Sequence, residues 1–352
     1  MIRLFWRWVR RVAFGLLFIV LVLLLPVAYT ETMCRPMPGG DAYRALITDA
    51  AWQRPETGTL MSYPAWHIVH AYEDYAEVLR TGDPHDFDYL KSVFGFWSSL
   101  CVVTEASGAH GGVPPGIKQR VYTIGVSFTV ELAVKALYEE TLGRLAATLR
   151  GPERSPLDIL SAEQAANYAA YLSQLPWYRW DFRADLAALT AASTGSLRDR
   201  ERNLALGIEL RTRSGYAKLI AAAAAGVGPD ELTLRSVVSG ITATELRTIP
   251  GVTVIAERPD GTEIETPRHA EFTSILEGLA ARGAKLVEIA GNDDILFTAL
   301  SDEPWADGEI YQFQRQGFRD YRHLILVKVA DLLAAIAALP DKGLRLEQVH
   351  DY

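Results

Sequence analysis

Two histidines and an aspartate occur at a spacing that suits a metal site or proton transfer. The stretch YPAWHIVHAYEDY covers residues 63 to 75 and contains His67, His70 and Asp74. In a helix, which turns by ~100° per residue, these three side chains fall on one side across two turns. Imidazole and carboxylate groups are ligands of transition metals, and a His–Asp pair can act in acid–base catalysis. The three residues are therefore a candidate metal or catalytic cluster.

A simpler interpretation of the same helix is that these residues face water. Its other side carries an apolar stripe, and polar residues opposite such a stripe are usually solvent-exposed. The stretch also lacks the glutamate and the i,i+4 histidine spacing of an HExxH zinc motif. We expect a solvent-exposed face rather than histidines packed in a core; a face turned toward the helix that contains Glu131 is the alternative. The apolar stripe consists of Ala65, Ile68, Val69, Tyr72, Ala76 and Leu79.

A second candidate lies in YTIGVSFTVELAVKALYEE, residues 122 to 140. This helix is apolar on both sides, which is typical of a helix at the centre of a domain. Glu131 and Lys135 are spaced as an i,i+4 ion pair within one of its apolar stripes. Buried ionisable groups of this kind often mark catalytic sites, but structural ion pairs produce the same pattern. Both interpretations, a catalytic Glu131 and Lys135 or a structural pair, stay open at this point.

Aromatic residues gather without a period between residues 302 and 321, in DEPWADGEIYQFQRQGFRDY. Aromatic side chains mixed with arginine are typical of protein interfaces. Trp305, Tyr311 and Phe318 are therefore a candidate partner surface, unless they only cover the edge of a sheet.

The N-terminus predicts a membrane anchor. Four arginines occur in residues 1 to 11, and residues 12 to 29 then form an uncharged run of 18 residues. As a helix this run is ~27 Å long, close to the thickness of the hydrocarbon core of a bilayer. The positive-inside rule then predicts a single pass, with the N-terminus in the cytoplasm and the remaining chain in the periplasm or outside the cell. A cleaved signal peptide is the alternative, but the run is long for one, and Tyr29, Glu31 and Met33 stand where cleavage favours small residues.

The chain has two cysteines, Cys34 just after the apolar run and Cys101. In an exported domain such a pair can form a disulfide. Two separate thiols, with Cys101 packed in a core, are the alternative.

The remaining chain divides by its patterns into two parts. After a Pro/Gly-rich tether at residues 30–40, residues 41–235 have helical periodicity, beginning with a short helix from Asp41 to Ala51. Residues 240–352 alternate short strands with helices, which predicts an α+β sandwich of the ferredoxin-like kind. One ambiguity is HLILVKVADLLAAI, which is either a strand followed by a helix or one continuous helix. We detect no internal sequence repeat.

Composition narrows the function classes. The net charge is −8, and basic runs are confined to the N-terminus, so nucleic acid is not expected as a partner. The GxSxG, GxGxxG and Walker motifs are absent from the sequence, and no cofactor is predicted. We therefore expect a binding or accessory protein anchored in the inner membrane, engaging an envelope protein, a lipid or a small ligand. The alternative is an envelope enzyme, with or without a metal, that uses His67, His70, Asp74, Glu131 and Lys135.

Overall fold

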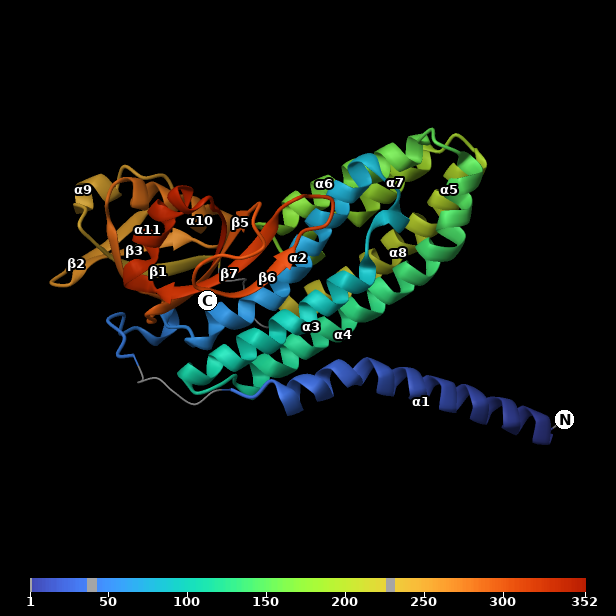
Figure 1. Ribbon diagram of the computed structural model, residues 1–352, viewed down its shortest axis with the longest axis horizontal. Helices are drawn as coiled ribbons and strands as arrows, with labels where there is room; N and C mark the ends of the chain where they lie inside the picture. Colours follow the sequence, from blue (N-terminus) through green and yellow to red (C-terminus); the bar gives the residue numbers. More distant parts are fainter. Residues whose placement is uncertain (1, 37–42, 226–231) are drawn as a thin grey trace.

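The first helix is long, apolar and separate from most of the chain. The computed structural model describes residues 2–36, 43–225 and 232–352. Helix α1 spans Ile2–Met33, and its part from Trp6 to Met33 is long and apolar enough to cross a membrane. In Figure 1 it lies below α3 and α4, and its N-terminal part extends away from the other elements. The end of the expected tether and the start of the expected helix at Asp41 lie outside the described residues. Residues 43–49 are not helical, and only a 3-10 turn follows, at Ala50–Trp52.

A helical bundle occupies the middle of the chain. Its longest members are α2, α4 and α8, and a π-helical turn at Glu139–Gly143 joins α4 to α5. Breaks that contain Gly or Pro separate the other helices. The bundle helices are α2 (Thr57–Thr81), α3 (Tyr89–Ala106), α4 (Pro115–Tyr138), α5 (Arg144–Arg150), α6 (Pro156–Leu172), α7 (Phe182–Ala192) and α8 (Leu197–Ala225).

Two antiparallel sheets of four strands form the C-terminal part, so the α+β class is confirmed. The first sheet has the order β2-β3-β1-β4 and the second the order β6-β7-β5-β8. A helix connects the third and fourth strand of each sheet: α10 in the first and α11 in the second. The elements are β1 (Thr233–Ser239), α9 (Ala243–Leu246), β2 (Thr253–Arg258), β3 (Gly261–Pro267), α10 (His269–Ala281), β4 (Lys285–Ile289), β5 (Asp294–Ser301), β6 (Glu309–Gln314), β7 (Tyr321–Lys328), α11 (Val329–Ala338) and β8 (Arg345–His350).

This arrangement is a structural repeat that the sequence did not reveal. Apart from the short helix α9 between β1 and β2, each half runs strand–strand–strand–helix–strand and pairs its strands in the same order, whereas we expected a single ferredoxin-like sandwich. The ambiguous segment at HLILVKVADLLAAI is a strand, β7, followed by a helix, α11. Both connecting helices pack with both sheets into one apolar core.

The second sheet is buried on both faces, and this places it against helix α2. Successive side chains of a strand point to opposite faces. In β5, Phe297 belongs to the core with α10 and α11, while its neighbour Leu296 packs into the core of the helical bundle. In β7, Leu324 likewise packs into the bundle core, and Ile325 packs into the core with α10 and α11. Helix α2 therefore lies between the bundle and the second sheet (Figure 1).

Candidate functional site

The predicted histidine face of α2 is buried, so our expectation of a solvent-exposed face is wrong. His67 is 1% exposed, His70 5% and Asp74 1%. The reason is that this side of α2 is covered by α3 and α4 at His67 and by the second sheet and its β6–β7 loop at His70 and Asp74. A helix that is packed on both sides has no solvent-exposed face. The apolar and polar pattern of α2 alone does not show that a second layer covers its polar side.

His67 is a core histidine, which we had excluded. Its Nε2 lies 2.9 Å from the carbonyl oxygen of Ser92, and the rings of Phe96, Phe128 and Phe313 surround it. Burial lowers the pKa of His67 to about 3, so the ring is neutral at pH 7 and donates to Ser92. His67 therefore joins α2 to α3.

Asp74 holds the loop between β6 and β7. Its Oδ2 accepts a hydrogen bond from the backbone N–H of Gln316 at 2.8 Å, and its Oδ1 lies 3.7 Å from Arg315 Nε. Burial raises the pKa of Asp74 to about 7. This carboxylate connects α2 to the sheet rather than facing a ligand.

His70 is the member of the predicted cluster that lies at a ligand-sized opening. Its Nδ1 is 3.7 Å from Glu73 Oε2, and its Nε2 is 3.9 Å from Glu347 Oε2. Each of these three residues offers a ligand atom within 4.8 Å of the others, whereas His67 and Asp74 belong to no such group among the described residues. The predicted triad thus does not converge, and His70 has Glu73 and Glu347 as partners instead.

Sequence reasoning missed these two partners for different reasons. Glu73 is three residues after His70, so helical spacing was a usable signal for it. Glu347 lies on β8, and nothing local to that strand connects it to α2.

Two arginines hold the carboxylates of this group in place. Arg322 donates from Nε and Nη2 to the two oxygens of Glu347, both at 2.6 Å. Arg315 donates to Glu73 at 2.9 Å. Burial opposes ionisation of Glu347, but the Arg322 charge holds the pKa of that carboxyl far below its usual range. Burial, followed by the charge of Arg322, lowers the pKa of His70, so its ring is neutral at pH 7.

His70, Glu73 and Glu347 line a cleft between the bundle and the second sheet. The cleft has a volume of about 910 Å³. One wall is helix α6, which presents the small side chains Ala162, Ala166, Ala169 and Ala170. The opposite wall is β8 together with Arg315 and Phe318 from the loop after β6. The cleft thus combines an alanine-rich wall with charged residues of both signs, a composition that can hold a small ligand with an apolar and a polar end.

Glu131 and Lys135 lie elsewhere and do not pair with each other. Glu131 accepts a hydrogen bond from the Tyr72 hydroxyl at 2.7 Å and pairs with Arg213. Lys135 Nζ lies 3.0 Å from Glu209 Oε1. Both pairs join α4 to α8, so the structure does not bring the five residues of the enzyme alternative into one pocket. The sequence did not indicate which basic and acidic residues of α8 would face α4.

The three candidate partner-surface residues have different surroundings. Trp305 is 68% exposed. Tyr311 is half-buried and packs against the bundle core. Phe318 lines the cleft, with the Arg315 guanidinium 3.5 Å from its ring centroid.

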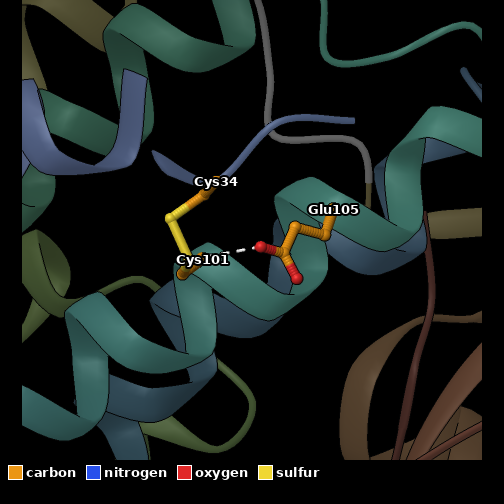
Figure 2. Close-up of side chains that lie close together, drawn as sticks. All are labelled: Cys34, Cys101 and Glu105. Atoms are coloured by element: carbon orange, nitrogen blue, oxygen red, sulfur yellow. Dashed lines mark hydrogen bonds between the residues drawn. A yellow bond between two sulfur atoms is a disulfide. The ribbon is translucent and has the colours of Figure 1, made fainter. Parts of the chain in front are cut away.

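The two cysteines form a disulfide in the structure. Figure 2 shows Cys34, just after α1, bonded to Cys101 on α3, with Glu105 Oε1 3.9 Å from Cys101 Sγ. The bond fastens the end of α1 to the bundle.

A second group of potential ligand atoms, Glu56, His110 and Asp294, lies where α2 begins. Glu56 accepts the backbone N–H groups of Asp293 and Asp294, and Lys328 Nζ lies 2.7 Å from Asp294 Oδ2. The carboxylates of both groups have partners, but the His70 group also lines the large cleft and is therefore the better candidate. Comparison of the chain with protein family models, curated proteins and solved structures found no match.

Proposed function

We propose that the protein is a membrane-anchored binding protein whose cleft holds a ligand by a cationic, amine-bearing end. The observation that carries this proposal is the environment of His70 Nε2. This atom is buried, has no hydrogen-bond partner among the described residues, and faces the carboxylate of Glu347, which also lines the cleft. A neutral imidazole nitrogen and two carboxylates together offer hydrogen-bond acceptors, and the charges of Glu73 and Glu347 are balanced by Arg315 and Arg322.

An ammonium group matches this set of acceptors. It has three N–H donors and a positive charge, and each carboxylate retains lone pairs beyond those used by its arginine. The alanine wall of α6 would then lie along an apolar body attached to the ammonium group. A free α-amino group of a peptide is one ligand of this class.

The location supports a function outside the cytoplasm. Four arginines lie in the first turns of α1, before its uncharged run at residues 12–29, as expected for a helix with a cytoplasmic N-terminus. The bond between Cys34 and Cys101 is of the kind that persists in oxidising compartments. We propose a single-pass inner-membrane anchor, with the bundle and the two sheets in the periplasm.

Calorimetric titration of the full chain in lipid nanodiscs tests the ligand class. The probes are trialanine amide with a free amino group and the same peptide with an acetylated N-terminus. We expect heat of binding from the free peptide, at least tenfold weaker binding of the acetylated one, and loss of binding in His70→Ala and Glu73→Gln. Glu163→Gln, which changes a carboxylate on the α6 wall of the same cleft, is the matched control and should bind normally. Absence of binding, or equal binding of the two peptides, would refute the proposal.

A metal-dependent enzyme is the second candidate, because His70, Glu73 and Glu347 can each direct a ligand atom to one point. Titration of the same nanodiscs with zinc chloride separates the two candidates. Tight binding of zinc that His70→Ala abolishes, without binding of the free peptide, would favour the metal site. The Arg322 charge beside Glu347 favours the amine instead, because it repels a divalent cation more strongly than a singly charged ammonium group.

A further inference from the structure

The outer side of α4 and α5 is apolar although no other described part of the chain covers it. Along these helices Val134 is 63% exposed, Leu137 70%, Leu142 59% and Leu149 65%. Together with Val130 and Leu145 they form what we call the aliphatic stripe. Six large aliphatic side chains facing outward are unusual for a helix packed on a soluble bundle.

Three of the five charged residues between Val130 and Leu149 point the opposite way. Glu131 and Lys135 pair with residues of α8, and Glu139 Oε1 lies 2.9 Å from Arg202 Nη1, whose side chain is buried. On the outer side, the described charges between Val130 and Leu149 are Glu140 and Arg144, which pair with each other at 2.6 Å. Charged groups inside and leucines outside are the arrangement of helices that contact lipid.

The π-helical turn keeps the stripe continuous. Glu139–Gly143 contains one residue more than an α-helical turn needs, so the helix face shifts back by ~100°. Because of this shift, three later leucines point within ~80°, around the helix axis, of the direction of Val130 and Leu137: Leu142, Leu145 and Leu149. Without the shift these leucines would point toward the bundle interior. The same turn directs Glu139 to Arg202.

The attachment of α1 brings this side of the bundle to the membrane. Glu31, near the end of α1, lies 3.0 Å from Lys118 Nζ and accepts a hydrogen bond from the Tyr122 hydroxyl at 2.7 Å. From this attachment, α1 toward its N-terminus and α4 toward its C-terminus run in the same general direction, diverging with distance (Figure 1). The aliphatic stripe is thus displaced from Glu31 in the direction in which α1 enters the bilayer.

Helix α3 extends the apolar surface. Leu90 is 56% exposed and Phe94 is 69% exposed. By helical rotation both lie on the side of α3 that carries Cys101, the residue bonded to Cys34. The side of α3 that contacts the end of α1 at Cys101 is therefore also apolar at Leu90 and Phe94, where α1 no longer covers α3.

We propose that the aliphatic stripe rests in the acyl-chain boundary of the bilayer, so that α4 and α5 form a second membrane contact beside α1. This inference rests on the proposed membrane anchorage of α1. The stripe consists of valine and leucine, without the tryptophan, tyrosine and arginine that anchor protein interfaces. Lipid requires no shape-specific partner, and an aliphatic surface suits acyl chains.

Depth-dependent fluorescence quenching tests the contact on the full chain in liposomes. An environment-sensitive NBD dye is attached to one added cysteine, with the native disulfide kept oxidised. The positions are Leu137→Cys and Leu145→Cys in the stripe, Leu17→Cys in α1, and Trp305→Cys as an exposed control on the sheet part. We expect lipids with doxyl-labelled acyl chains to quench both stripe positions to an extent comparable with Leu17, and aqueous iodide to quench only position 305.

The possible outcomes distinguish the membrane contact of the aliphatic stripe from the membrane anchorage of α1. Iodide quenching at both stripe positions, with Leu17 protected, would overturn the membrane contact and leave the anchor intact. Iodide quenching at Leu17 would overturn the anchor itself. Protection of the stripe from both iodide and doxyl lipids would show that a second copy of the chain covers it, which also overturns the inference.

Discussion

His70 and Glu347 face each other across the boundary between the helical bundle and the second sheet, with Nε2 and Oε2 3.9 Å apart. Neither residue is close to the other in the chain, so their approach depends on how the sheet docks on α2. Arg322 fixes the carboxylate from the sheet side, and Glu73 flanks the imidazole from the helix side. The candidate binding site and the docking of the two parts therefore share the same side chains.

Removal of Arg322 should destabilise the protein strongly. This side chain is 1% exposed and makes both charge-assisted hydrogen bonds to Glu347. Arg322→Met leaves a buried carboxylate without its partner, which costs about 3–5 kcal/mol. Urea unfolding of the full chain in detergent, followed by circular dichroism, measures this change. Arg80→Met, at an exposed pair with Glu77 on the rim of the same cleft, is the control and should leave the midpoint unchanged.

His350 should tolerate replacement by an apolar ring. It is fully buried beside Tyr63 and Trp66, and neither ring nitrogen has a hydrogen-bond partner among the described residues. His350→Phe removes two buried polar atoms and keeps the ring, so we expect the unfolding free energy to stay equal or rise by about 1 kcal/mol. A marked fall in thermal midpoint would show that the nitrogens are satisfied in solution.

The buried histidines should make the protein sensitive to acid. Burial lowers the pKa of His67 and of His350 to about 3, below their usual value of 6.5. Between these values the unfolded chain binds more protons than the folded one, so stability falls as pH drops from about 6.5 toward 3. Asp74 and Glu56, whose pKa values burial raises to about 7, act in the opposite sense over that range. Burial also lowers the pKa values of His70 and His110, so we expect the histidines to outweigh these two acids.

Unfolding free energies measured between pH 4 and 8 check this balance. We expect a positive slope with pH below about 6.5 and a shallower slope in His350→Phe. A flat profile for the wild type would contradict the neutral, buried state of these rings.

Loss of the disulfide should weaken the attachment of α1. Cys34 and Cys101 are separated by 67 residues, and a crosslink over a loop of this length typically contributes about 2–4 kcal/mol. We expect the double substitution Cys34→Ser with Cys101→Ser to lower the thermal midpoint, and dithiothreitol to do the same to the wild type. Dithiothreitol should have no effect on the double variant; an equal effect there would mean that the reductant acts by another route.

The local sequence pattern was sufficient to predict the helices and strands, but not to predict how they pack against one another. Alternation and helical periodicity predict the α+β class, the apolar N-terminal helix and the separation of helices from strands. The burial of His67 was not predictable, because it depends on Phe313 of β6, far away in the chain. Glu131 shows the same limit: its partner Arg213 comes from α8, and helical spacing pointed to Lys135 instead. The repeat of the two sheets also left no sequence pattern that we detected.

Two glycine-to-alanine substitutions, one at the contact and one as a control, test how closely the second sheet approaches α3. A Cβ added at Gly95 on α3 would lie 2.4 Å from Phe313 Cε2 and 2.7 Å from His67 Cε1. Gly95→Ala must therefore push β6 away from α3 or shift His67, and overpacking of this kind costs about 1–3 kcal/mol. Gly215 on α8 is also helical, but a Cβ there meets nothing within 4 Å. Gly215→Ala should raise stability by about 0.5–1 kcal/mol, because alanine restricts the unfolded chain. Urea unfolding measures both variants. If Phe313 packs against α3, the two substitutions should change the unfolding free energy in opposite directions; if the sheet does not contact the bundle in solution, both should raise it.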